Sequence, residues 1–221
     1  MEQLVKLQGN CSSELVIKMG AALKENPNAK IILDLGDVTG LTEIPQEAFG
    51  NNSSLVEITL PESVTEIGED AFSNCTSLTS ITIPDSVTSI GRYAFSYCTS
   101  LKSVTIQSTL IKNIERGLFM GCTALTDINI PSSVTSITYD AFSGCTSLKN
   151  ITIPANVQTI GNTAFQNCTS LTTVNILSTV LTSIGNSAFN KCPSLTSNSD
   201  ITKAEFVSWT KGVWKFSGES K

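Results

Sequence analysis

The residues best suited to chemistry in this 221-residue chain are cysteines at a nearly fixed interval. Regularly spaced cysteines can form disulfides, bind a metal ion or fill a core. The chain has no histidine, which excludes histidine-based catalytic triads and histidine metal ligands, and no cysteine pair has zinc-ribbon spacing. Six of the seven cysteines each lie three residues after a phenylalanine: Cys75, Cys98, Cys122, Cys145, Cys168 and Cys192.

These phenylalanines mark a repeat that must position the cysteines. Their spacings are 23, 23, 24, 23, 23 and 24 residues. A fixed period of this length is typical of a solenoid, in which each copy covers the core of its neighbour. The sequence therefore predicts one elongated body rather than two globular domains. The repeated phenylalanines are Phe49, Phe72, Phe95, Phe119, Phe142, Phe165 and Phe189.

The repeat favours buried thiols over disulfides. Strands of stacked copies lie roughly 4.8 Å apart, which is within reach of a bridge. Equivalent side chains of successive copies point in the same direction, however, and a disulfide needs two facing Cβ vectors. We therefore expect a ladder of small buried thiols, with Asn52 in the equivalent place of the first copy. Disulfides or metal binding remain the alternative.

Each copy divides into three short segments, illustrated by Leu78 to Cys98. Ile81-Thr82-Ile83 alternates apolar and polar residues and predicts a strand, which Pro84 ends because proline has no N–H to donate. Residues 87–90 predict a second short strand, and Gly91 is expected to permit the next corner. Residues 92–98 are expected to form one turn of helix.

Two copies are one residue longer than the others. The extra residue falls within Gln107–Ile111 in one copy and within Leu177–Leu181 in the other, and both segments lack the usual proline. We expect small bulges there, with Leu110 and Val180 partly exposed.

The two ends depart from the repeat and predict three regions. Residues 1–30 are expected to form a helical N-terminal cap, in which a serine before Leu15 caps a helix with an apolar stripe. Residues 31–197 form the solenoid of about seven repeats, and residues 198–221 form a C-terminal cap and tail. The last region contains both tryptophans, Trp209 and Trp214, so an aromatic contact surface is the alternative reading of it.

Composition excludes several classes of function. The net charge is −5 and the pI is about 4.8, whereas nucleic-acid binding needs a basic stripe. No apolar run approaches the roughly 20 residues that span a bilayer, and the sequence after Met1 does not read as a secretory signal. No glycine-rich phosphate loop precedes a helix, and no cofactor or catalytic residue is expected.

The outward-facing residues of the first strand form the candidate binding site. They carry hydroxyl, amide and a few acidic groups, which offer many shallow hydrogen bonds to a partner. The alternative is structural, because threonine is a good exposed strand residue. The first row is Thr59, Thr82, Thr105, Asn129, Thr152 and Asn175, and the row beside it is Glu57, Ser80, Ser103, Asp127, Asn150 and Thr173.

An acidic cluster is a second candidate. Glu62, Glu66, Glu69 and Asp70 lie within one copy, and carboxylates could bind calcium or simply form a solvated rim. Asn-x-Ser/Thr sequons, as at Asn74, are by-products of the repeat.

The consensus Leu-x-x-Ile-x-Ile-Pro-x-x-Val-x-x-Ile-Gly-x-x-Ala-Phe-x-x-Cys resembles the BspA-like, or treponemal-type, class of leucine-rich repeats. The resemblance covers residues 41–196. It implies an α/β repeat solenoid: a curved, right-handed superhelix with a parallel β-sheet on one face and short strands or helical turns on the other. It also implies bacterial, and some protozoan, surface proteins that mediate adhesion.

The leading hypothesis is a non-enzymatic, cell-surface or secreted adhesion module that binds through the sheet face. The resemblance implies host extracellular-matrix or plasma proteins or other microbial surface proteins as partners, and the leading hypothesis also includes glycans. The alternatives are an intracellular interaction scaffold or an immune-modulating repeat protein. We expect a monomer or weak self-association.

Overall fold

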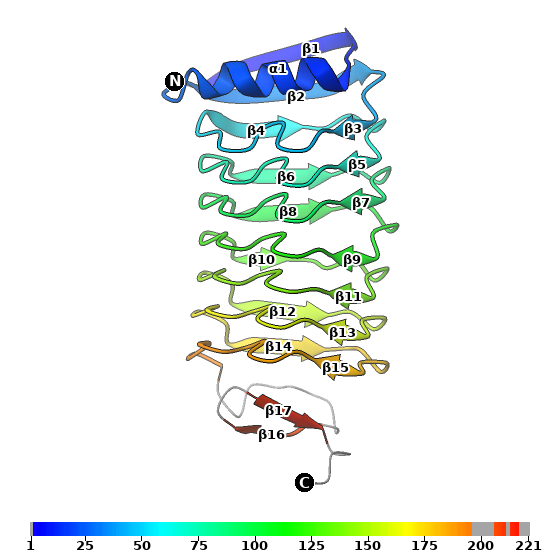
Figure 1. The fold of residues 1–221 in the computed structure, drawn as a ribbon, viewed down its shortest axis with the longest axis vertical. Helices are drawn as coiled ribbons and strands as arrows, with labels where there is room; N and C mark the ends of the chain where they lie inside the picture. Colours follow the sequence, from blue (N-terminus) through cyan, green and yellow to red (C-terminus); the bar gives the residue numbers. More distant parts are fainter. Residues whose placement is uncertain (1, 196–205, 211–212, 217–221) are drawn as a thin grey trace.

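A computed structural model describes residues 2–195, 206–210 and 213–216 of the chain. The solenoid is a stack of coils, each made of one longer strand, one short strand and a connecting run of turns (Figure 1). The expected leucine-rich-repeat solenoid with a parallel sheet face is thereby confirmed.

The longer strands build the main sheet. Six of them pair in parallel in the order β1-β2-β4-β6-β8-β10, and two more form the separate pair β12-β14. The alternation of buried isoleucine or valine with exposed polar residues places one side of each strand in the core. The strands are β1 (Glu2–Asn10), β2 (Lys30–Thr39), β4 (Leu55–Thr59), β6 (Ser80–Ile83), β8 (Ser103–Ile106), β10 (Asp127–Ile128), β12 (Asn150–Ile153) and β14 (Thr173–Ile176).

The second segment of each copy forms the predicted short strands. They pair in parallel in two sheets, β3-β5-β7 and β15-β13-β11-β9, on the other side of the coil (Figure 1). The strands are β3 (Glu43–Ile44), β5 (Glu66–Ile67), β7 (Ser89–Ile90), β9 (Asn113–Ile114), β11 (Ser136–Ile137), β13 (Thr159–Ile160) and β15 (Ser183–Ile184).

The third segment is not the turn of helix that we expected. In the copy at Phe95 it consists of consecutive turns, with φ of +57° at Tyr93 and +55° at Tyr97. The N–H groups of Tyr93, Phe95 and Tyr97 donate to carbonyl oxygens of the next coil at 2.6–3.1 Å. Alternate N–H groups therefore bond between coils, which a helix would prevent by bonding them internally.

The core is a column of stacked rings. Successive repeat phenylalanines have ring centroids 5.1–5.8 Å apart, and their planes differ by no more than 20°. Burying one such side chain contributes roughly 1.5–3 kcal/mol, whereas ordering the backbone costs roughly 1–2 kcal/mol per residue. One coil cannot offset that cost alone, so stability depends on stacking.

The repeated cysteines form the expected ladder of buried, unpaired thiols. Each thiol donates to the main-chain carbonyl oxygen of the phenylalanine one coil earlier, as Cys98 Sγ does to Phe72 O at 3.1 Å. The six Sγ–O distances are 3.1–3.2 Å. The sulfur thus satisfies a carbonyl group at the turn as well as filling space.

The glycine after the short strand has a different role from the one we expected. Gly91 does not adopt a positive φ. A Cβ atom at this position would lie 2.4 Å from the main-chain nitrogen of Glu69 in the preceding coil. Glycine therefore allows close approach of two backbones rather than a special corner conformation.

The N-terminal region contains a strand that the sequence analysis missed. β1 pairs in parallel with β2, and α1 (Ser13–Lys24) connects them, so the cap is a β-α-β unit. The helix begins as expected, because the Ser12 hydroxyl accepts from the Leu15 N–H at 3.3 Å. The helix has 12 residues, and no helix in the described part of the chain is long and apolar enough to cross a membrane.

The two longer copies accommodate their extra residue in the corner after the strand. The pairing of β8 with β6 continues in register as far as Ile106, so no bulge interrupts this ladder. Buried Ser108 donates to the carbonyl oxygen of Val87 and accepts from the Leu110 N–H at 3.1 Å. Leu110 and Val180 are 49% and 47% exposed, as predicted.

The predicted C-terminal cap lies largely outside the described residues. Strands β16 (Phe206–Thr210) and β17 (Val213–Phe216) pair antiparallel, with Trp209 opposite Trp214. The side chains of these strands and the predicted tail at residues 217–221 are not described.

Candidate functional site

The outer face of the main sheet presents the predicted rows of polar side chains. In the first row, Asn175 is partly buried and the other members are exposed: Thr59, Thr82, Thr105, Asn129 and Thr152. In the second row, Ser80 and Thr173 are partly buried, and the exposed members are Glu57, Ser103, Asp127 and Asn150. The structure therefore makes most of these groups available to a partner.

Strand register brings neighbouring members of each row together. Thr82 pairs with Thr105, and Ser80 pairs with Ser103. A boundary separates this part from the pair β12-β14, where Thr152 is opposite Asn175. Asn129 lies just beyond the end of β10, which stops at Ile128.

Two shallow hollows lie on this face, and both are lined by predicted residues. The first has a volume of about 350 Å³ and is bounded by Glu57, Thr59, Ser80, Thr82 and Gln107, among others. The second has a volume of about 270 Å³ and is bounded by Ser103, Thr105, Asp127, Asn129 and Lys102, among others. Hydroxyl, amide and carboxylate groups at the rims can donate and accept hydrogen bonds.

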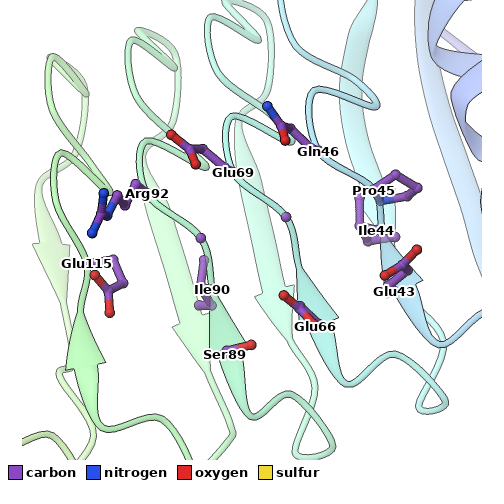
Figure 2. A pocket seen from close by; sticks show the side chains of 12 residues that line it. Glu43, Ile44, Pro45, Gln46, Glu66, Glu69, Ser89, Ile90, Arg92 and Glu115 are labelled. Atoms are coloured by element: carbon purple, nitrogen blue, oxygen red, sulfur yellow. The ribbon is translucent and has the colours of Figure 1, made fainter.

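A larger groove lies on the face of the short strands. Its volume is about 570 Å³, and Glu43, Glu66, Glu69 and Glu115 contribute four carboxylates to its lining. Figure 2 shows these side chains along successive coils, and Arg92 lines the same groove. Glu43 and Glu66 are direct neighbours in the pairing of β3 with β5. The groove is therefore predominantly acidic.

The predicted acidic cluster is divided between two faces. Glu66 and Glu69 line the acidic groove, whereas Glu62 lines the first hollow of the main sheet. Burial raises the pKa of Asp70 despite its hydrogen bond to Ser73, and Glu69 and Glu47 add to the increase. Within residues 2–195 and the two described C-terminal strands, no group of three histidine, cysteine or acidic side chains is placed to hold a metal ion.

Four of the six repeated thiols are poorly suited to nucleophilic chemistry. Burial raises the pKa of Cys75 and Cys122 to about 12, and it raises the pKa of Cys98 and Cys145 well above its ordinary value. A thiolate rather than a thiol is the nucleophile and the metal ligand. At neutral pH these cysteines are therefore protonated core residues.

The sequon asparagines have a backbone role. Asn74 and Asn167 have φ of +58° and +60°, a left-handed conformation that asparagine tolerates better than most residues. The side chain of Asn74 also donates to Asn51 Oδ1 in the preceding coil at 3.0 Å. The repeated asparagine is thus explained by the turn.

Sequence analysis missed a cluster of aromatic and basic side chains on the turns. The guanidinium carbon of Arg116 lies 5.7 Å from the ring centroid of Tyr93 and 5.0 Å from that of Tyr139. The available signal was composition: all three tyrosines and both arginines of the chain fall within residues 92–139.

Comparisons with solved structures identify similar bacterial solenoids. The leucine-rich repeat protein of T. pallidum is 31% identical with a TM-score of 0.70, and the match covers 77% of this chain and 80% of that protein. A leucine-rich repeat protein of Eubacterium ventriosum is 26% identical with a TM-score of 0.65, covering 79% of this chain and 55% of that one. This chain thus spans about half the length of the Eubacterium protein.

A third solved structure agrees with these two. The leucine-rich repeat protein of Bacteroides ovatus is 26% identical with a TM-score of 0.54, and the match covers 87% of this chain and 62% of that protein. No curated protein matches this chain. The sequence model described as "BspA type Leucine rich repeat region (6 copies)" matches residues 34–113 and 112–207. The chain therefore belongs to the BspA-type leucine-rich repeat family.

Proposed function

We propose that this chain is a non-enzymatic binding module of a bacterial surface or secreted protein and that it binds proteins or glycans through the outer face of its main sheet. The observation that carries the proposal is the coincidence of the predicted polar rows with the two hollows on that face. Thr59 and Thr82 border the first hollow, and Thr105 and Asn129 border the second.

The physical argument rests on repetition. Stacked coils present the same few groups at regular intervals along an extended surface, and solenoids use such surfaces to hold large partners. Each hydrogen bond to a partner contributes little, because water already satisfies these exposed groups. Affinity therefore requires contact over several coils, which favours an extended chain or a broad surface as the partner.

Location at the cell surface is part of the proposal, and it rests on membership of the family and on the properties that the resemblance implies. Extracellular-matrix proteins, plasma proteins and the surface proteins of other microbes are the proposed partners.

The experiment that tests this function measures equilibrium binding of the purified chain to a panel of extracellular-matrix and plasma proteins and to a glycan array. The expected result is saturable binding to at least one member that does not depend on added metal ions. The proposal would be contradicted if the chain bound no member of the protein panel and no glycan of the array.

A second candidate is an intracellular interaction scaffold, which the seven unpaired thiols favour. Disulfides persist mainly in oxidising compartments, and free thiols are the rule in the cytosol. Fractionation of cells that express the complete gene distinguishes the two candidates. Recovery with the cell envelope or the medium supports the surface module, and recovery in the cytosol supports the scaffold.

A further inference from the structure

The turn face carries aromatic and basic side chains that the proposed function does not use. We define the Tyr–Arg patch as Arg116, the two tyrosines whose rings it overlies, Tyr93 and Tyr139, and Tyr97 from the same turn segment as Tyr93. These residues come from three consecutive coils. Tyr97 and Tyr139 are 50% and 42% exposed, and Arg116 is also exposed. All three tyrosines of the chain belong to this patch, so aromatic side chains with hydroxyl groups are confined to one site.

Stacking on two rings orients the guanidinium group. Arg116 comes from the coil between those of Tyr93 and Tyr139, and its guanidinium carbon lies over both rings. No ion pair or hydrogen bond joins the Arg116 side chain to another residue of the described part of the chain. Its planar set of N–H donors therefore remains available to a ligand while the stacking limits its motion.

Glycines in the next coil make room for the tyrosine rings. A Cβ atom on Gly117 would lie 2.3 Å from Cδ1 of Tyr93, and one on Gly121 would lie 2.5 Å from Cδ1 of Tyr97. Gly117 is the one glycine at its position among the seven coils, whereas Gly144 shares the position of Gly121 without a tyrosine in the preceding coil. The patch is therefore a locally adapted part of the repeat rather than an isolated exposed residue.

The backbone makes these tyrosines costly for the fold. Tyr93 and Tyr97 adopt φ of +57° and +55°, a conformation that is unusual for bulky side chains. All seven coils have positive φ at these two positions, so the conformation belongs to the repeat, and only the bulky tyrosines are specific to this coil. The other six copies have non-aromatic residues at the two positions, namely Glu47 and Asn51, Asp70 and Asn74, Gly117 and Gly121, Asp140 and Gly144, Thr163 and Asn167, and Ser187 and Lys191.

We propose that the Tyr–Arg patch is a second interaction surface, which binds a protein segment carrying a carboxylate next to an apolar side chain. Arg116 would hold the carboxylate through paired hydrogen bonds, and the tyrosine rings would cover the apolar neighbour. Tyrosine and arginine are the residue types enriched at the energetic centres of protein interfaces.

Charge favours a protein segment over an anionic polymer. Arg116 is the one arginine of the patch as defined, and Arg92 lines the acidic groove together with Glu69 and Glu115 (Figure 2). The chain as a whole has a net charge of −5. A polyanion needs several basic groups along its length, whereas one carboxylate among apolar groups needs only the arginine that the patch provides.

A random peptide library displayed on phage tests the proposal with the full chain as bait. We expect selected peptides to be enriched in aspartate or glutamate beside apolar residues. Binding of the synthetic peptides should weaken roughly tenfold or more in Arg116→Gln and in Tyr97→Asn. Tyr97→Asn keeps the fold testable, because Asn51, Asn74 and Asn167 occupy the equivalent position in other coils.

Two control variants separate this surface from its surroundings. Lys112→Gln removes an exposed positive charge outside the patch, and Thr82→Lys alters the main sheet. Both should bind the peptides as the parent does. The proposal is overturned if the selected peptides lack acidic residues, if Arg116→Gln binds them unchanged, or if no peptide is selected. If the chain binds acidic glycans on an array through Arg116 and binds no peptide, the proposal that the partner is a protein segment is overturned.

Discussion

The side-chain amide of Asn52 donates to the main-chain carbonyl oxygen of Gly20 at 3.3 Å and thereby joins the N-terminal helix to the first coil. Its carbonyl oxygen accepts from the N–H groups of Ser54 and Leu55 at 3.0 and 3.2 Å. Later coils have cysteine at this position and another coil beneath it. Asn52 therefore replaces the cysteine in the first coil, where the neighbour is the N-terminal helix instead of another coil.

Weakening this junction should loosen the cap before it unfolds the solenoid. Asn52→Ala leaves buried donors without partners, so we expect a loss of about 2 kcal/mol or more in the free energy of unfolding. Gly20→Ala should also destabilise, because its Cβ would lie 1.7 Å from the carbonyl oxygen of Ala48. Urea unfolding measures the loss, and hydrogen exchange should show faster exchange first in α1.

Ala21→Ser on the exposed side of the helix is the matched control and should change stability little. Equal exchange rates in α1 for the parent and for Asn52→Ala would contradict the role given to this junction.

The stacked phenylalanines predict a second effect. Phe119 is fully buried and lies 5.8 Å from Phe95 and 5.4 Å from Phe142, measured between ring centroids. Phe119→Ala should reduce the free energy of unfolding by about 3–5 kcal/mol, since it removes contacts with both neighbouring coils. Phe119→Leu keeps much of the volume and should cost less. A loss below about 1 kcal/mol for the alanine variant would show that the stack does not determine stability.

The buried thiols predict a loss of stability in alkali. The folded pKa of Cys122 is raised to about 12 from an ordinary value of 9.0. Above pH 9 the unfolded chain releases this proton while the folded chain keeps it, so the stabilising contribution is complete below pH 9 and is lost between pH 9 and 12. One such thiol lowers the free energy of unfolding by up to about 1.4 kcal/mol per pH unit in that range.

Urea unfolding under reducing conditions at several pH values measures this slope. Cys122→Ala serves as the comparison, because tyrosine and lysine also titrate in alkali and remain in both proteins. The variant should be less stable at neutral pH and should lose stability less steeply above pH 9. Parallel curves for the two proteins would contradict a raised thiol pKa.

Local patterns predicted much of the fold. The alternation in Ile81-Thr82-Ile83 identifies a strand with one buried face, and the fixed interval between Phe72 and Phe95 identifies the stacking. Strand β1 escaped detection because it lies outside the repeat and its partner β2 is separated from it by the helix. Its pairing is a tertiary contact that no local pattern encodes.

The turn segment shows how one pattern can fit two structures. Buried Ala94, Phe95 and Cys98 have helical spacing, but Tyr93, just before them, and Tyr97, just before Cys98, have positive φ. The glycines and asparagines at the equivalent places in other copies favour left-handed backbone, and this evidence appears only when the copies are compared.

Exposure of the polar rows followed from strand alternation, whereas the hollow beside Thr82 depends on residues from three coils and the hollow beside Thr105 on residues from two. The contact of Arg116 with Tyr93 likewise joins two adjacent coils at two different positions of the repeat. Both features required the coils to be placed in space.

The most direct test of the central claim is equilibrium binding by a triple variant, Thr82→Lys, Thr105→Lys and Thr152→Lys, to whichever panel member the parent binds. The matched control, Ser89→Lys, Asn113→Lys and Ser183→Lys, adds the same charge at exposed positions of the short strands. The account predicts that the sheet-face variant folds and that its affinity falls by roughly tenfold or more, while the control binds as the parent does. Unchanged binding by a folded sheet-face variant would contradict the claim.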